Sequence, residues 1–205
     1  MIHTIKFIDF SKVTKMKDQI RSMIEESIET KKKVNEFILK DIESAAKLVI
    51  STIKSGKKIM LAGNGGSASQ ASHIAAEFVG RYKIERKGLP SIALTTDTSV
   101  ITAWSNDYSY DTLFSRQIEA LGSKGDVFIA ITTSGNSKNL VNAVNAAKKL
   151  GIKTIGMLGR DGGKLKGMCD VEVIVPSDNT PRIQETHLMI MHIMCEITDN
   201  ELFSK

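Results

Sequence analysis

Apolar residues form two kinds of pattern along the chain from residue 57 onward. Short continuous apolar runs, typical of strands covered on both faces, are separated by longer segments in which apolar residues recur with helical spacing. The runs predict strands at residues 59–62, 91–95, 126–131, 154–158 and 171–175. The spacing predicts helices after the first strand, at 100–104, 114–121 and 138–150, and at about 182–202. Because strands that alternate with helices form parallel βαβ units, we expect an α/β fold, a three-layer α/β/α sandwich with a five-stranded parallel sheet.

Two amphipathic helices are predicted before the first strand. Apolar residues keep helical spacing over residues 12–32 and again over residues 34–53. We interpret the lysine run at 31–33 as the solvated junction between these helices. The first helix follows no strand, so it serves either as a contact between subunits or as a layer packed on its own domain.

The length of the chain is that of one ordinary domain. At 205 residues it can form a sizeable hydrophobic core, and no internal repeat or linker divides it. Residues 1–10 fit a short strand or a loosely docked arm. We therefore divide the chain into an N-terminal arm at 1–12 and a single domain at 13–205, which includes the two N-terminal helices.

Charge and cysteine content argue against several classes of protein. The net charge of +5 is scattered and forms no basic stripe with aromatic residues, as nucleic-acid binders have. No apolar run approaches the length of a membrane span, and the N-terminus lacks the pattern of a signal peptide. Cys169 and Cys195 lie in apolar surroundings without CxxC spacing, which favours buried thiols over a disulfide. We expect a cytoplasmic protein with no nucleic-acid or membrane partner.

A glycine turn at residues 63–66 joins the first strand to a helix. Gly63, Gly65 and Gly66 permit positive φ and close approach of a ligand, and the helix that follows directs its free N–H groups at the turn. The turn has neither G-x-G-x-x-G spacing nor the lysine of a P-loop. It is therefore either a plain connection or an anion site, and the polar residues farther along the same helix favour the anion site.

A second loop, at residues 132–137, is rich in hydroxyl groups; we call it the hydroxyl loop. It follows the third strand and places four hydroxyls and a glycine before a helix. Ser137 alone would be explained as an N-cap, but a cap needs only one hydroxyl. Four suit the oxygens of a phosphate monoester better. Both this loop and the glycine turn follow strands, so both lie at the carboxyl edge of the sheet, where such folds bind ligands.

Four polar residues lie on two helices that are distant in sequence. His73 and Glu77 are one turn apart on one helix, while Gln184 and His192 share a stripe of the last helix. Together they offer a donor set for a divalent metal such as zinc, or equally a carboxylate base with a histidine acid. Each is also explained as an ordinary structural group, unless the fold brings the two helices together.

Three long motifs carry a resemblance to a known family. AGNGGSASQASHIAAEFVGR, the segment from ALTTDTSVITAW to ITTSGNSKNL, and PRIQETHLMIMHIMCEI resemble the phosphoheptose isomerases of the sugar-isomerase (SIS) family, over about residues 15–203. The resemblance implies reversible conversion of D-sedoheptulose 7-phosphate to D-glycero-D-manno-heptose 7-phosphate, the first step toward nucleotide-activated heptose for lipopolysaccharide or capsule. It also implies a homotetramer with active sites between subunits and one zinc ion per subunit.

The resemblance also assigns roles to individual residues. It implies Glu77 as the base, which also touches the sugar, and His192 as the acid. Contacts to the substrate are implied for Asn64, Gly65, Gly66, Asn106, Asp107, Thr132, Thr133, Ser134, Ser137 and Gln184. Zinc ligands are implied at His73, Glu77, Gln184 and His192. Thr132 stands where the family commonly has serine and keeps the hydroxyl, whereas Pro181 stands where an acidic residue is often found.

Two other functions fit the same fold. A non-catalytic SIS-family tetramer that binds the replication initiator would not need the acid and the base, and both Glu77 and His192 are present here. A sugar-phosphate-sensing regulator usually carries a DNA-binding domain, for which 205 residues leave no room. The sequence therefore favours the enzyme.

Overall fold

The computed structural model of the chain describes residues 10–203, and side chains from residue 15 onward. The strand or arm predicted at 1–10 lies outside the described residues except for Phe10, which begins the first helix, α1. The helix thus starts two residues earlier than predicted. No helix within the described range is both long and apolar enough to cross a membrane.

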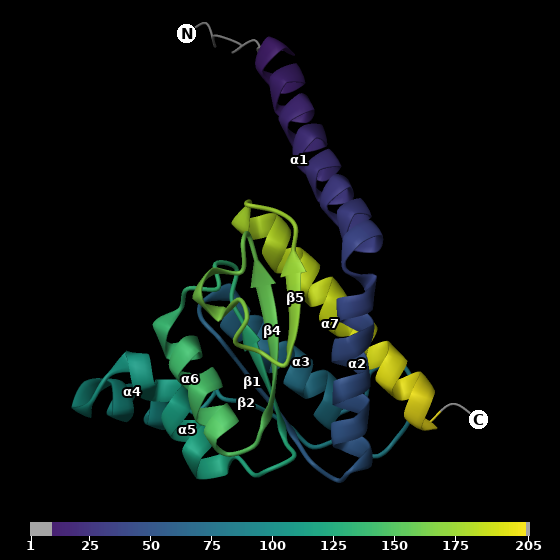
Figure 1. The fold of residues 1–205 in the computed structure, drawn as a ribbon. Helices are drawn as coiled ribbons and strands as arrows, with labels where there is room; N and C mark the ends of the chain where they lie inside the picture. Colours follow the sequence, from purple (N-terminus) through teal and green to yellow (C-terminus); the bar gives the residue numbers. More distant parts are fainter. Residues whose placement is uncertain (1–9, 204–205) are drawn as a thin grey trace, which may run out of the picture.

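Five parallel strands form the sheet, in the order β2-β1-β3-β4-β5 (Figure 1). Their bounds are Ile59–Gly63 for β1, Ser91–Ala93 for β2, Val127–Ile131 for β3, Lys153–Gly159 for β4 and Val171–Val175 for β5. Every residue of β1 and β3 is buried, as the continuous apolar runs predicted. The five-stranded parallel sheet is confirmed.

Helices cover both faces of the sheet. The bounds are Leu39–Lys54 for α2, Gly66–Val79 for α3 and Thr180–Phe203 for α7 on one face, and Thr98–Asp107 for α4, Leu113–Leu121 for α5 and Lys138–Lys149 for α6 on the other. Ile59 and Leu61 of β1 pack into the core under the first group, whereas Met60 and Ala62 pack under the second. This alternation of side chains gives two cores and confirms the three-layer sandwich.

The strand order reverses at β1, and this reversal positions the candidate site. From β1 the chain crosses to β2 on one side, then returns to β3 on the other side. The carboxyl ends of β1 and β3 therefore form the topological switch point, where parallel α/β sheets bind ligands. The glycine turn follows β1 and the hydroxyl loop follows β3, so the fold places both at this point.

The junction between the first two helices is not where the lysine run predicted it. α1 spans Phe10–Phe37, so residues 31–33 lie inside it, and the break comes at Ile38 with φ −124° and ψ 14°. Lysine is a good helix former, so three in a row do not end a helix. Val34 and Ile38 are both buried in the core, which indicates that packing, and not local propensity, sets the break.

α1 extends away from the body of the domain (Figure 1). Its apolar side chains are exposed by 47–63%: Met16, Ile20, Met23, Ile24 and Ile28. Polar contacts hold its middle to the start of α7: Ser27 Oγ donates to Glu185, Asn179 Nδ2 donates to Glu26, and Arg182 donates to the Met23 carbonyl. The chain itself therefore holds this helix but does not cover its apolar stripe.

Three other boundaries differ from the predictions. Asn106 and Asp107 form the last turn of α4 and not a polar loop, and Pro181 lies in the first turn of α7, where its missing N–H costs no helical hydrogen bond. The loop after β4 holds a short 3₁₀ turn, Gly163–Leu165, labelled η2, and another, η1 at Tyr110–Thr112, precedes α5.

A buried carboxylate ties β1 to β3 at the amino edge of the sheet. Asp126 accepts hydrogen bonds from Lys58 N, Lys58 Nζ and Ser123 N, and its side chain is 2% exposed. Burial acts to raise the pKa of this carboxyl, but the hydrogen bonds from Lys58 and Ser123 and the charge of Lys58 together lower the pKa below its ordinary value. Asp126 therefore contributes stability above the unfolded-state pKa, and this contribution is lost as pH falls through the lower folded-state pKa.

We expect Asp126→Asn to lower the free energy of unfolding by about 2–4 kcal/mol at neutral pH, because a charged and hydrogen-bonded buried partner is removed. Urea denaturation at pH 7 measures this, and the difference between variant and parent should shrink at acid pH. Asp18→Asn is the control, since Asp18 pairs with Arg21 at the surface and such pairs contribute at most about 1 kcal/mol. Equal losses in the two variants would contradict the role assigned to Asp126.

Candidate active site

The glycine turn is packed too tightly for side chains at two of its positions. A Cβ on Gly63 would lie 2.7 Å from the backbone of Ser67, and one on Gly66 would lie 2.6 Å from the side-chain amide of Gln184. Gly65 has φ +55° and precedes the first residue of α3. The turn is thus closed from one side by α7, and α3 begins directly beneath it.

The hydroxyl loop keeps its hydroxyl groups free of helix capping. Ser137 occupies the N-cap position of α6, yet its side chain makes no capping hydrogen bond, and its Oγ lies 3.2 Å from Oγ1 of the buried Thr132. The simple N-cap explanation is therefore wrong for this hydroxyl. Thr133 and Ser134 follow at the half-exposed turn of the loop, and Ser134 Oγ accepts from Asn136 N.

The loop after β4 supports the hydroxyl loop through main-chain contacts. Leu165 N donates to the Gly135 carbonyl, and Lys164 N donates to the side-chain oxygen of Asn136. Gly135 has φ +65°, and a Cβ there would lie 1.8 Å from the Gly162 carbonyl oxygen. The two segments therefore pack backbone against backbone.

Asn64 links the glycine turn to the hydroxyl loop. Its Nδ2 donates to Asn139 Oδ1 at 3.0 Å, and its Oδ1 accepts from Asn139 Nδ2 at 2.9 Å and from the Tyr110 hydroxyl at 2.8 Å. Sequence reasoning missed Asn139 and Tyr110. Asn139 is 3% exposed and lies on the buried face of α6 with Ala143, so a polar residue at an apolar position was the available signal.

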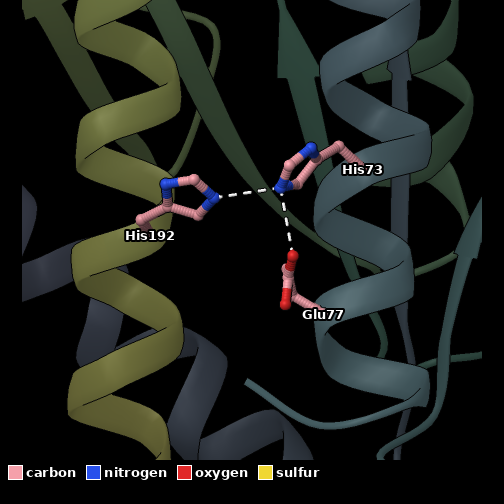
Figure 2. A group of neighbouring side chains, drawn as sticks. All are labelled: His73, Glu77 and His192. Carbon is pink, nitrogen blue, oxygen red and sulfur yellow. Dashed lines mark hydrogen bonds and ion pairs between the residues drawn. The ribbon is translucent and has the colours of Figure 1, made fainter. Parts of the chain in front are cut away.

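His73, Glu77 and His192 meet between α3 and α7; we call them the His–Glu–His cluster (Figure 2). His73 Nε2 lies 3.0 Å from Glu77 Oε1 and 3.1 Å from His192 Nε2. One ligand atom from each residue lies within 4.8 Å of the other two. The fold thus brings three of the four predicted polar residues together.

The electrostatics of the cluster favour a neutral His192. Burial lowers the pKa of His192, and the neighbouring His73 lowers it further, against the opposing effect of Glu77. The ring also stacks on Tyr82, with centroids 5.6 Å apart. A neutral ring keeps a lone pair, so the cluster directs two imidazoles and a carboxylate at one point. Such a set can hold a zinc ion with a fourth position open, or can transfer protons.

Gln184 does not join the cluster within one chain. It lies eight residues before His192 on α7, which corresponds to about 12 Å of helix, and its amide packs on Gly66 instead. Gln70 Nε2 also donates to the backbone carbonyl of Gln184. The single chain therefore places Gln184 at the glycine turn, and the predicted four-residue metal set is split.

Asn106 and Asp107 also stand apart from the other candidates. Both are exposed at the end of α4, where Asn106 Nδ2 donates to Asp107 Oδ1. In the part of the chain that the structure describes, no hydrogen bond or ion pair joins either residue to the two loops or to the cluster.

The segment between α3 and β2 is more than the polar connection that its sequence indicates. Tyr82 packs on His192, and Arg86 is buried, bonded both to Asp199 of α7 and to the Glu77 carbonyl. Nothing in the pattern distinguishes Arg86 from the exposed basic residues around it, because arginine is usually exposed.

The comparisons with known proteins agree with this geometry. The SIS domain family model matches residues 22–159. The chain is 58% identical to the phosphoheptose isomerase of Aliarcobacter butzleri over 85% of this chain and 92% of that protein, and 54% identical to that of Sulfurimonas denitrificans over 92% and 97%. The solved phosphoheptose isomerase of Neisseria gonorrhoeae superposes with a TM-score of 0.86 at 41% identity, covering 90% of this chain and 99% of that one. The chain therefore belongs to the SIS family and, within it, to the phosphoheptose isomerases, which are aldose–ketose isomerases.

Proposed function

We propose that the chain interconverts D-sedoheptulose 7-phosphate and D-glycero-D-manno-heptose 7-phosphate through a cis-enediol, and that the His–Glu–His cluster carries the chemistry. The observation that supports this most directly is the meeting of Glu77 and His192 from two helices, beside the switch point of the sheet. Moving a proton between C1 and C2 requires a base above the carbon skeleton and an acid near O1 and O2. The cluster offers one group of each kind.

Glu77 is the proposed base and His192 the proposed acid. The Glu77 side chain is 25% exposed, so its carboxylate is partly desolvated but can still reach a ligand. The lowered pKa of His192 keeps the ring largely neutral at pH 7, which lets it give a proton to one oxygen and accept one from the other. Each group should contribute about 10²- to 10⁴-fold in rate.

The substrate phosphate is proposed to bind at the hydroxyl loop. Ser137 Oγ and Thr132 Oγ1 face each other at the start of α6, whose N-terminus favours negative charge. The phosphate is on C7, at the opposite end of the carbon chain from C1 and C2, so the reaction needs two separate subsites. His73 lies seven residues beyond Gly66 on α3, about 10 Å along the helix, which provides that separation. Asn64, Gly65 and Gly66 would then contact the sugar between the two subsites.

A zinc ion is the proposed cofactor, one per subunit. Two histidine nitrogens and a carboxylate oxygen within 4.8 Å of one another are a donor set that zinc prefers, so the residues fit the ion. When bound, zinc would supply Lewis-acid polarisation of the sugar oxygens. Glu77 and His192 would then exchange between holding the ion and holding a proton.

A homotetramer with shared active sites is the proposed assembly. The apolar stripe of α1 is exposed in the single chain, and Gln184, Asn106 and Asp107 stand apart from the cluster of their own chain. Sites between subunits would allow these residues to complete a neighbour's site. The chain's two cysteines are unpaired thiols, which supports the cytoplasm as the proposed location.

Removing a hydroxyl from the phosphate subsite should weaken substrate binding. We expect Ser137→Ala and Ser134→Ala each to cost about 1.5–3 kcal/mol, seen mainly as a raised KM for sedoheptulose 7-phosphate. Steady-state kinetics measure this. Ser44→Ala is the control, because Ser44 lies exposed on α2 and bonds only its own helix. An unchanged KM in both loop variants would place the phosphate elsewhere.

Removing the acid or the base should abolish turnover and spare binding. We expect Glu77→Gln and His192→Gln each to lower kcat by at least about a hundredfold. Isothermal titration with the sugar phosphate should still show binding, because the hydroxyl loop is intact. Glu43→Gln, at an exposed ion pair of α2, is the matched control. A folded Glu77→Gln protein with near-parental turnover would end the case for the enzyme base and favour a binding protein.

The metal proposal predicts zinc in the purified protein. Prepared without chelator, the chain should carry about one zinc per subunit, and His73→Asn should lose it while keeping the melting temperature within a few degrees. Elemental analysis and a melting curve test this together. Full activity after chelation, with no transition metal left, would reject a metal requirement.

The assembly proposal predicts a mass near four chains by light scattering. Ile24→Glu places a charge in the apolar stripe of α1 and should shift the mass to smaller species, whereas Glu25→Lys, on the neighbouring polar side of the helix, should not. A parent protein that is monomeric and fully active would exclude shared sites.

A further inference from the structure

A buried ion pair lies between α3 and α7, close to the His–Glu–His cluster. Arg86 Nε donates to Asp199 Oδ1 at 2.6 Å, and the two side chains are exposed by only 1% and 2%. Lys83 N donates to the other carboxylate oxygen. A buried ion pair contributes little net stability, because the desolvation of two charges offsets their attraction. A role in fixing geometry accounts better for such a pair at this place.

The guanidinium of Arg86 closes the C-terminal end of α3. Its Nη2 donates to the Glu77 carbonyl at 2.9 Å, and its Nη1 donates to the Phe78 carbonyl at 2.9 Å and to the Gly80 carbonyl at 3.4 Å. The last carbonyls of a helix lack partners within the helix, and a positive charge there is favourable. Arg86 therefore holds the turn of α3 that carries Glu77.

The carboxylate partner belongs to the helix that carries His192. Asp199 follows His192 by seven residues, two turns of α7, so both side chains lie on the same face of that helix. One guanidinium thus joins the end of α3 to α7 on the face where the cluster forms. Tyr82, in the same connecting segment, stacks on the His192 ring.

We infer that Arg86 and Asp199 are positioning residues that set the distance between α3 and α7, and through it the placement of Glu77 and His73 against His192. This inference rests on the proposed function for the roles of the cluster. Neither residue touches the cluster's side chains or the proposed phosphate subsite. Their loss should therefore change kcat and metal affinity more than KM.

The test compares two isosteric changes at buried, ion-paired carboxylates. Asp199→Asn disturbs the α3–α7 pair, and Asp126→Asn disturbs the pair at the opposite, amino edge of the sheet. Zinc affinity is measured by competition with a chromophoric chelator, and kcat and KM are measured on protein shown by melting to be folded. We expect Asp199→Asn to weaken zinc binding by about 10- to 100-fold and to lower kcat by at least about tenfold, with KM changed less than about threefold. Asp126→Asn should leave all three within about threefold.

A second variant covers the case in which Asp199→Asn does not fold. Arg86→Lys keeps the charge but cannot reach Asp199 and the α3 carbonyls together, so it should show the same loss of zinc affinity and kcat in milder form. If the folded variants match Asp126→Asn in zinc affinity and kcat, the inference is overturned, whatever Glu77→Gln does. If they lose zinc affinity while Glu77→Gln keeps turnover, the positioning role stands and the proposed base is wrong.

Discussion

All five strands end at one edge of the sheet, and the reversal of strand order at β1 leaves a gap there between two outgoing connections. The rest of the site depends on this constraint. The glycine turn and the hydroxyl loop come from different parts of the sequence, yet they must emerge side by side. Reciprocal hydrogen bonds between Asn64 and Asn139 then join the two. The sheet supplies the neighbourhood, and side-chain amides fix the register of the two loops.

The chemistry lies on helices and not on the strands. α3 starts at the switch point and carries His73 and Glu77 away from it, while α7 crosses over the glycine turn and brings His192 alongside. Two helices packed on a sheet can slide relative to each other unless specific contacts prevent it. The amide of Gln184 against Gly66 at one end and the guanidinium of Arg86 at the other hold this pair of helices at two points.

Much of the fold and part of the site could be predicted from the sequence, for identifiable reasons. Continuous apolar runs located the strands because a doubly covered sheet needs them, and loops after strands converge whatever their sequence distance. Helical spacing gave the face of Gln184 and His192 but not their height along α7, so the pair was predicted to meet at one metal. The break at Ile38 depends on burial that no local pattern encodes. Arg86 was missed because its environment is created only when α3 and α7 come together.

Gly135 and Gly162 make the path of the hydroxyl loop a property of the main chain. Two backbones in van der Waals contact leave no space for a Cβ at Gly135, and Leu165 N holds the same peptide by a hydrogen bond. The shape of the loop therefore does not depend on which side chains it carries at neighbouring positions. Hydroxyls can be exchanged for one another, as threonine is accommodated at position 132, while the curve that presents them stays the same. This separation of shape from chemistry gives a lineage a way to change the group recognised at this edge of the sheet without rebuilding the fold beneath it.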